Sequence, residues 1–516
     1  MKMFILGLDG ASFRLVNEFV EKGKMPVHEK VIKNGCYGKL NSTVPPHTAP
    51  GWVSAFTGVS PGEHGVYQFW DTQASNYVGK FMGLRDFRVP PVWNILNMNG
   101  VKTGLVNIPM THPPAKLDGF MITWPLSNTL RYAYPEDILF KIAEYGGHYA
   151  SDLSVMYDGN LDYIDKAINI TKKRVKSIEY LIRNCEWDIL ISVFTEIDRV
   201  CHFYWHFMDS KSRHYEAGAS EKLKNAIEDI YCEADKALGK ILEILPDDVP
   251  VMVISDHGFN VGDINFYVQT YLMDKSLLGI KKAGDSADIL DKVKNSWFDC
   301  EIEGERYIVD WSKTVAYMAA PGSYGINVNL KGRQQCGIVE QSDYESVRDN
   351  LISILENITH PYDHSKLFKK VARREEVYKG KSLTMAPDII LIPENYSTMV
   401  HHNLKPGQTF GIPEHKGMHD PDGIFAIYRE HQSYKDTPES ACIEDVAATI
   451  LNYYGICTPE YMEGKPIIQF ENTGLRNPEM GAYSADTYTL ASDSEGAYTE
   501  DERKEAEEKL KSLGYL

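Results

Sequence analysis

The residues of this sequence best suited to chemistry are carboxylates and imidazoles that follow short apolar runs. Asp9 comes directly after the apolar residues 3–8, and Asp256 and His257 come just beyond the apolar residues 251–254. Aspartate oxygens and histidine nitrogens are ligands of zinc-type divalent cations. The sequence therefore predicts a metal centre at the ends of buried strands.

Asp198 and His202 form a second pair of this kind. They follow the apolar residues 189–194, and their spacing of four residues brings both side chains to one face of a helical turn, where they can grip one cation together. His206, one turn further along, is an additional candidate ligand. The aromatic residues around it in the segment 203–207 favour a packed helix face instead.

Thr48 is a candidate residue of a phosphate site. It lies in the segment 45–52, whose sequence PPHTAPGW leads into a helix of small residues that ends near residue 57. Proline and glycine at this density fix the backbone, and a hydroxyl group at the start of a helix lies beside amide donors that can hold a phosphoryl oxygen. This arrangement suits contact with the phosphoryl group of a substrate.

Each of these residues also has a structural explanation when it is considered alone. Asp9 and Thr48 are common helix N-cap residue types. His419 precedes a further apolar run, residues 423–428, but spacing does not distinguish it from three other histidines of the same region. Those histidines are His401, His402 and His415.

Strand-like and helical patterns alternate along the first half of the chain. This alternation predicts an α/β fold with a mostly parallel central sheet and helices on both faces. The carboxyl ends of the strands carry the site in such sheets, and Asp9, Asp198 and Asp256 each lie just past a strand. The strand-like runs are 3–8, 104–108, 189–194 and 249–255, and the helical runs are 13–22, 163–183 and 217–245.

The pattern divides the chain into a core, an insertion and a tail. We expect residues 1–261 to form the first part of a catalytic core and 386–471 the second part, because alternation loosens between them. Residues 262–385 are expected to form an inserted cap that influences substrate choice. The segment 472–516 is expected to be a linker followed by a short charged helix, which a capping-box pattern of Thr499 and Glu502 opens.

Bulk properties exclude several classes of protein. The chain has 516 residues, 43% of them hydrophobic and 24% charged, and a formal net charge of -18, which argues against binding to a nucleic-acid duplex. No apolar stretch approaches the roughly 20 residues of a membrane helix, and the first eight residues do not form a signal-peptide core. The eight cysteines include no C-x-x-C pair, so reduced thiols and a cytoplasmic location are expected. The oligomeric state is not predicted.

Taken together and in this order, the motifs resemble those of the alkaline phosphatase superfamily, most closely the type I phosphodiesterase/nucleotide pyrophosphatase branch. The resemblance covers residues 4 to about 451. The motifs that carry it are Leu8-Asp9-Gly10, Thr48 with Thr57-Gly58, Gly62-Glu63-His64-Gly65, Asp198 with His202, Ser255-Asp256-His257-Gly258, and His419 with Gly423-Ile424-Phe425.

This resemblance implies an alkaline phosphatase-like fold and two divalent metal ions, zinc before manganese. It implies that Thr48 attacks phosphorus to give a phosphothreonyl intermediate, in a hydrolase that cleaves phosphodiester or phosphoanhydride bonds of a small phosphorylated substrate. The implied ligands are Asp198, His202 and His419 for one metal, and Asp9, Asp256, His257 and the Thr48 oxygen for the other.

The chain departs from its relatives at two positions near Thr48. Nucleotide pyrophosphatases carry an Asn three residues after the nucleophile, where this chain has Gly51, so one phosphoryl contact is missing or comes from elsewhere. Sulfatases carry an Arg where this chain has Trp52, and their nucleophile is not Thr, which argues against sulfatase activity. A phosphotransferase or mutase that uses the same intermediate, and a binding protein on the same fold, are the alternatives.

Overall fold

The fold is described from a computed structural model that covers most of the chain. It describes residues 1–77, 79–127, 129, 131–150, 162–284, 298–318, 320–432, 434, 437–470, 474–481 and 500–512. These residues form two compact units. The first contains Met1–Val66, Met82–Val261 and His415–Leu516, and the second contains Tyr67–Phe81 and Gly262–Glu414.

A large mixed sheet forms the centre of the first unit. The described residues build nine strands in the order β21-β2-β20-β7-β1-β6-β3-β4-β5, and most neighbours from β7 to β4 are parallel. The strands are β1 (Met3–Leu8), β2 (Cys36–Asn41), β3 (Thr103–Val106), β4 (Gly119–Ile122), β5 (Ala133–Tyr134), β6 (Ile189–Phe194), β7 (Val251–Ile254), β20 (Asp422–Tyr428) and β21 (Ser440–Cys442). The predicted α/β class with a mostly parallel sheet is confirmed.

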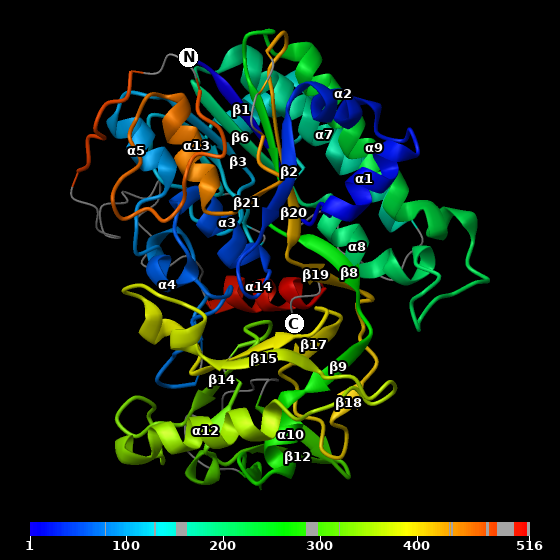
Figure 1. The fold of residues 1–516 in the computed structure, drawn as a ribbon, viewed down its shortest axis with the longest axis vertical. Coiled ribbons are helices and arrows are strands. Elements are labelled where there is room, and N and C mark those ends of the chain that lie inside the picture. Colours follow the sequence, from blue (N-terminus) through cyan, green and yellow to red (C-terminus); the bar gives the residue numbers. More distant parts are fainter. Residues whose placement is uncertain are drawn as a thin grey trace. The chain divides into compact units, whose positions relative to one another are not determined.

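Helices cover both faces of this sheet (Figure 1). One group packs around α9 and the other around α13. The first group comprises α1 (Phe13–Glu21), α2 (Pro26–Asn34), α7 (Tyr163–Asn184), α8 (Glu196–Met208) and α9 (Glu221–Ile244). The second comprises α3 (Thr48–Thr57), α5 (Val92–Met98) and α13 (Asp445–Tyr453), and the shorter helices α4 (Pro61–His64) and α6 (Ile138–Gly146) also belong to this unit.

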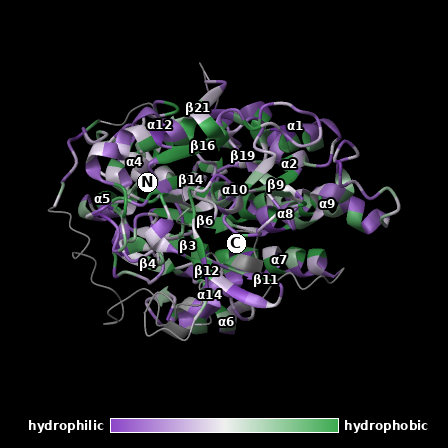
Figure 2. Cartoon of the chain, turned by 90° about the horizontal axis from the view of Figure 1, so that it is seen from below, coloured by the Kyte–Doolittle hydropathy of each residue, from purple (hydrophilic) through white to green (hydrophobic). Residues whose placement is uncertain are grey.

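Burial explains why the central strands are apolar along their whole length. Every residue of β1 and β6 is buried, as expected for parallel strands covered on both faces. Figure 2 shows β3 and β6 in the green of hydrophobic residues, whereas α1 and α9 alternate between green and purple. The helices therefore place their apolar faces on the sheet and their polar faces in solvent.

Strand register brings the ends of three strands to one edge. Leu8 of β1 lies opposite Phe194 of β6, and Gly7 lies opposite Ile254 of β7. The residues that follow these strands, among them Asp9 and Asp256, are consequently neighbours even though they lie far apart in sequence.

A separate two-stranded ribbon extends from this edge. β8 (Gly258–Val261) follows directly after His257, and it pairs antiparallel with β19 (Gly417–Asp420). In this register His419 lies opposite Phe259. The ribbon therefore carries His419 back to the strand end that bears His257.

The second unit contains three small sheets and two α-helices among its described residues. The sheets have the orders β10-β12-β11, β13-β14-β16-β15 and β17-β9-β18. Their strands are β9 (Ile264–Tyr267), β10 (Ile280–Lys282), β11 (Asp299–Ile302), β12 (Glu305–Val309), β13 (Ala316–Tyr317), β14 (Gly325–Val328), β15 (Phe368–Arg373), β16 (Ile389–Pro393), β17 (Thr398–His401) and β18 (Phe410–Gly411), and the helices are α10 (Val268–Asp274) and α12 (Tyr344–Leu355).

The second unit and the insertion expected at 262–385 both begin at residue 262, but they end at different residues. The unit continues to Glu414 and also includes Tyr67–Phe81. The apolar run 388–392 resembles a core strand in sequence, yet β16 pairs with β14 and β15 of the second unit. An apolar run does not by itself reveal its pairing partner, which explains the difference.

The tail contributes a last helix, α14 (Glu500–Ser512), to the first unit. Thr499, Leu513 and most of the expected linker lie outside the described residues. None of the eight cysteines forms a disulfide. Every helix in the described part of the chain is too short or too polar to cross a lipid bilayer.

Candidate metal centre

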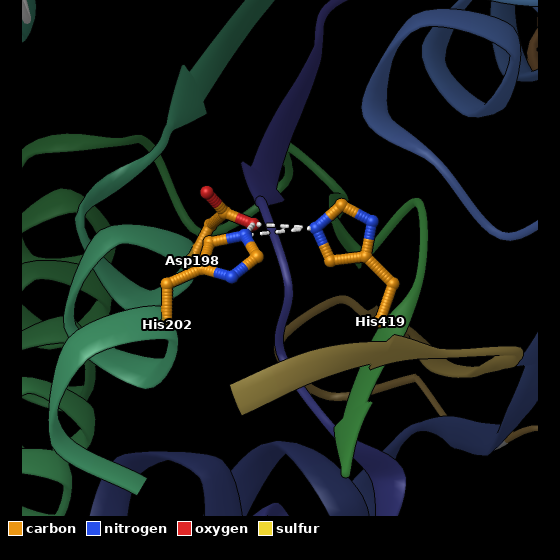
Figure 3. A group of neighbouring side chains, drawn as sticks. All are labelled: Asp198, His202 and His419. Carbon is orange, nitrogen blue, oxygen red and sulfur yellow. Dashed lines mark hydrogen bonds and ion pairs between the residues drawn. The ribbon is translucent and has the colours of Figure 1, made fainter. Parts of the chain in front are cut away.

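The first ligand group joins α8 to the ribbon. Asp198 lies in the first turn of α8, His202 lies one turn later, and His419 lies on β19. The Nε2 atom of His419 is 3.3 Å from Asp198 Oδ1 and 3.0 Å from His202 Nε2 (Figure 3). Asp198 Oδ1 and His202 Nε2 are 3.4 Å apart. Three donor atoms thus converge on one point.

The second ligand group lies at the ends of β1 and β7. It consists of Asp9, Asp256 and His257, all buried. His257 Nε2 is 3.2 Å from Asp256 Oδ2 and 3.6 Å from Asp9 Oδ1. It is also 4.0 Å from Asp198 Oδ1, so the two groups are adjacent.

Backbone carbonyls fix the orientation of all three histidines. The Nδ1 atoms of His202, His257 and His419 lie 3.0, 3.0 and 3.2 Å from the carbonyl oxygens of Gly417, Gly258 and Pro46, respectively. A carbonyl can only accept, so each Nδ1 carries the proton and each Nε2 presents a lone pair. This is the arrangement by which proteins orient metal-binding imidazoles.

Thr48 lies beside the second group. It is the first residue of α3, it is 1% exposed, and its Oγ1 atom is 3.3 Å from His257 Nε2 and 3.5 Å from Asp9 Oδ1. The N-cap of α3 is His47, not Thr48. Ser12, and not Asp9, occupies the N-cap position of α1. The simpler explanations of Thr48 and Asp9 as helix N-caps therefore do not apply.

The carboxylates carry strongly perturbed pKa values. Burial, and then the charges of Asp256 and Asp198, raise the pKa of Asp9 well above its usual value, and burial with the Asp198 charge raises that of Asp256 in the same way. Burial also opposes ionisation of Asp198, but His202, His419 and Arg199 together hold its pKa well below the usual value. Three carboxyl groups thus share a desolvated space that favours a cation.

Burial holds His257, His47 and His419 neutral. Burial, and then the neighbouring His419, lower the pKa values of His257 and His47 well below the usual range. Burial lowers the pKa of His419 as well. Neutral imidazoles are the form that binds metals.

Three groups that the sequence analysis did not assign hold the carboxylates in place. Trp52 donates from Nε1 to Asp9 Oδ2 at 2.9 Å, and Arg199 donates to Asp198 Oδ2 at 3.2 Å. The backbone N–H of Gly10 donates to Asp256 Oδ1 at 3.3 Å. In Asp9 and Asp198 the other oxygen faces the ligand group. A local signal existed for Arg199, since it lies inside the Asp198 motif, and for Trp52, which lies one helical turn after Thr48.

Two glycines make room for these contacts. A Cβ atom on Gly7 would lie 2.6 Å from Cη2 of Trp52, so glycine lets the indole reach over β1. A Cβ atom on Gly51 would lie 3.1 Å from Cβ of Asp256. The asparagine side chain that relatives carry at this position is therefore missing here, at the point where α3 approaches Asp256 closely.

The fold distinguishes His419 from the other histidines that the sequence offers as ligands. His401 and His402 belong to the second unit, whereas His419 and His415 belong to the first. The His415 ring lies 5.8 Å from that of His202, but among the described residues neither ligand group includes it. His206 lies 3.6 Å from Glu216 and is also outside both groups.

The residues present fit a pair of divalent cations. Two imidazole Nε2 atoms that both present lone pairs, as in His202 and His419, repel each other at 3.0 Å unless a cation lies between them. In the second group the buried Asp256 Oδ2 accepts no hydrogen bond from any described residue. Mixed nitrogen and carboxylate ligands suit zinc-type ions.

The family match and these ligand groups define a metal-dependent hydrolase of the phosphodiesterase and pyrophosphatase class. Residues 3–422 match the family described as type I phosphodiesterase/nucleotide pyrophosphatase, which is more than half of the chain. The protein belongs to this family. No curated protein matches the sequence.

Similar solved structures support the fold. The alkaline phosphatase PafA superposes with a TM-score of 0.57 at 13% identity, covering 90% of this chain and 98% of PafA. Phosphonoacetate hydrolase from Sinorhizobium meliloti 1021, in complex with phosphonoformate, superposes with a TM-score of 0.52 at 14% identity. The match covers 87% of this chain and 94% of the hydrolase chain. At these identities the likeness concerns the fold alone.

Proposed function

We propose that the protein is a two-metal phosphohydrolase that cleaves phosphodiester or phosphoanhydride bonds through a phosphothreonine intermediate. The observation that carries the proposal is the convergence of three oriented Nε2 lone pairs and three buried carboxylates in two adjacent groups, the second of which lies against the Thr48 hydroxyl group. Asp198, His202 and His419 would hold one ion, and Asp9, Asp256, His257 and Thr48 the other.

The chain's own residues account for most of the chemistry. Thr48 Oγ1 attacks phosphorus in line with the departing oxygen, and no histidine is placed to act as its base, because the His257 Nε2 atom next to it serves as a ligand. The two ions, when bound, lower the pKa of the Thr48 hydroxyl and neutralise substrate charge. Trp52 and Arg199 keep Asp9 and Asp198 aimed at the site. Water then releases the phosphoryl group from Thr48.

The substrate proposed is a small phosphorylated molecule, with zinc as the metal ahead of manganese. The donor set supports zinc, since nitrogen ligands disfavour magnesium and calcium. A cytoplasmic location stays a prediction from the sequence.

The test compares Thr48→Ala with Thr57→Ala. Thr57 lies at the other end of the same helix, is equally buried, and donates to the Val53 carbonyl at 2.7 Å, so its variant loses a hydroxyl group outside the site. With an aryl phosphodiester and no added acceptor, Thr48→Ala should lose activity by about 10³-fold or more. Both variants should bind two metals per chain, and Thr57→Ala should turn over. Retained activity in Thr48→Ala would exclude the phosphothreonine route.

A further inference from the structure

His47 precedes the proposed nucleophile and has a fixed orientation. It is 4% exposed, its backbone is extended, and its Nδ1 atom accepts a hydrogen bond of 3.1 Å from the backbone N–H of Ala49 as the N-cap of α3. An Nδ1 atom that accepts must carry a lone pair, so the proton of the neutral ring is on Nε2. His47 is therefore a hydrogen-bond donor at Nε2 and not a metal ligand.

The His47 ring lies beside the first ligand group. Its centroid is 5.7 Å from that of His419, with the rings edge to face, and the groups that act on it electrostatically include His419, Asp198, His202 and His257. The His47 ring thus lies in the buried space that holds the first ligand group.

Three backbone positions at the start of α3 offer no N–H group to a phosphoryl oxygen. The Ala49 N–H is engaged by His47, Pro50 has no N–H, and the Gly51 N–H donates to the His47 carbonyl at 2.9 Å. The asparagine of related enzymes is replaced by Gly51, where a side chain would press on Asp256. A phosphoryl group at Thr48 therefore lacks the contact that the asparagine makes in related enzymes.

We propose that His47 supplies this contact by donating its Nε2–H to a non-bridging oxygen of the phosphoryl group that Thr48 attacks. The proposal rests on the proposed function. The hydrogen bond takes the place of the missing asparagine contact, and it strengthens as charge grows on that oxygen in the transition state. The neutral ring donates without adding a positive charge to a site that already binds two cations.

The decisive variant is His47→Asn. Asparagine is a good N-cap whose side-chain oxygen can accept from the Ala49 N–H, so this change keeps the cap and removes the Nε2 donor. The control is His64→Asn, because His64 is also buried and its Nδ1 also accepts from an N–H two residues later, that of Val66, but it lies outside the ligand groups.

The substrates are an aryl methyl phosphodiester and its two phosphorothioate diastereomers, assayed on the zinc-loaded enzyme. His47→Asn should lower kcat/KM for the oxygen ester by about 10²-fold, the cost of losing one such donor. The loss should be smaller for the diastereomer whose sulfur replaces the contacted oxygen, since sulfur is a weak acceptor. His47→Gln, whose amide N–H can reach the place of Nε2, should recover part of the rate. The oxygen-to-sulfur ratio is the kcat/KM of the oxygen ester divided by that of each phosphorothioate. His64→Asn should leave both ratios unchanged.

An equal loss for all three substrates, or none, would overturn the role of His47, as would metal loss in His47→Asn that explains its whole effect. If Thr48→Ala retained activity, the proposed function itself would fail. Loss of activity in Thr48→Ala combined with unchanged oxygen-to-sulfur ratios in His47→Asn would remove only the role of His47.

Discussion

Trp52→Phe should weaken the second metal site while leaving the first intact. The indole Nε1 donates to Asp9 Oδ2 at 2.9 Å in a space where Asp9 is only 1% exposed. Phenylalanine keeps the ring beside Phe56, which stacks on Trp52 at 5.9 Å, but removes this donor. Asp9 then loses the group that fixes its rotation and favours its charged form, the form that binds metal.

The size of the effect follows from two separate estimates. A hydrogen bond to a charged group contributes about 1.5–3 kcal/mol. Loss of a partner that orients a metal ligand weakens affinity about 10–100-fold, which corresponds to about 1.4–2.8 kcal/mol. The two ranges agree, so the dissociation constant of the second metal should rise by about 10–100-fold.

The assay is a metal titration in competition with a chelator, which resolves the two sites by affinity. The control is Trp93→Phe. Trp93 is 2% exposed and packs on the same Phe56, at 5.7 Å, but its Nε1 has no hydrogen-bond partner among the described residues. Both variants lose similar packing, whereas only Trp52→Phe loses a donor to a ligand. Unchanged affinity in Trp52→Phe, or equal weakening in Trp93→Phe, would refute the reasoning.

Two further predictions concern histidines. His419→Ala should lower metal content to about one ion per chain, whereas His415→Ala should keep two; elemental analysis of both proteins tests this, and the opposite pattern would reassign the ligand. Burial lowers the pKa of His64 from 6.5 to about 3. Between these two pH values the unfolded chain binds a proton on this histidine that the folded chain does not bind. The free energy of unfolding therefore falls as the pH falls below 6.5. From pH 7 to pH 5 the wild type should lose about 2 kcal/mol more unfolding free energy than His64→Gln, and equal losses in urea titrations would contradict the argument.

Local patterns predicted the strand-end carboxylates because their signal is contained in a few residues. An apolar run of four residues followed by a serine and Asp256-His257 indicates a buried strand with ligands at its end, and β7 has this form. The spacing of Asp198 and His202 needs only one helical turn, which α8 supplies. The α/β class follows from the same alternation, and the sheet confirms it.

Non-local contacts explain what the sequence left open. The choice of His419 over His415 depends on the register of β8 with β19, and a shift of one residue would turn the His419 side chain to the other face of the ribbon. The role of Trp52 depends on the missing side chain of Gly7, 45 positions earlier in the chain. The end of the second unit depends on where β16 finds its partners. No short segment contains this information.

The place of β20 in the sheet has a consequence for biosynthesis. This strand, residues Asp422–Tyr428, lies between β2 and β7, which are formed from residues 36–41 and 251–254. A ribosome-bound chain that has not yet delivered residue 428 leaves facing edges on both of these strands, and His419 arrives only just before β20 does. The gap between β2 and β7 is therefore filled at nearly the same moment of synthesis as the candidate metal centre is completed, so metal capture would report that a nascent chain has closed the middle of its sheet. Chains that end before this point would expose two unpaired strand edges, which are templates for aggregation.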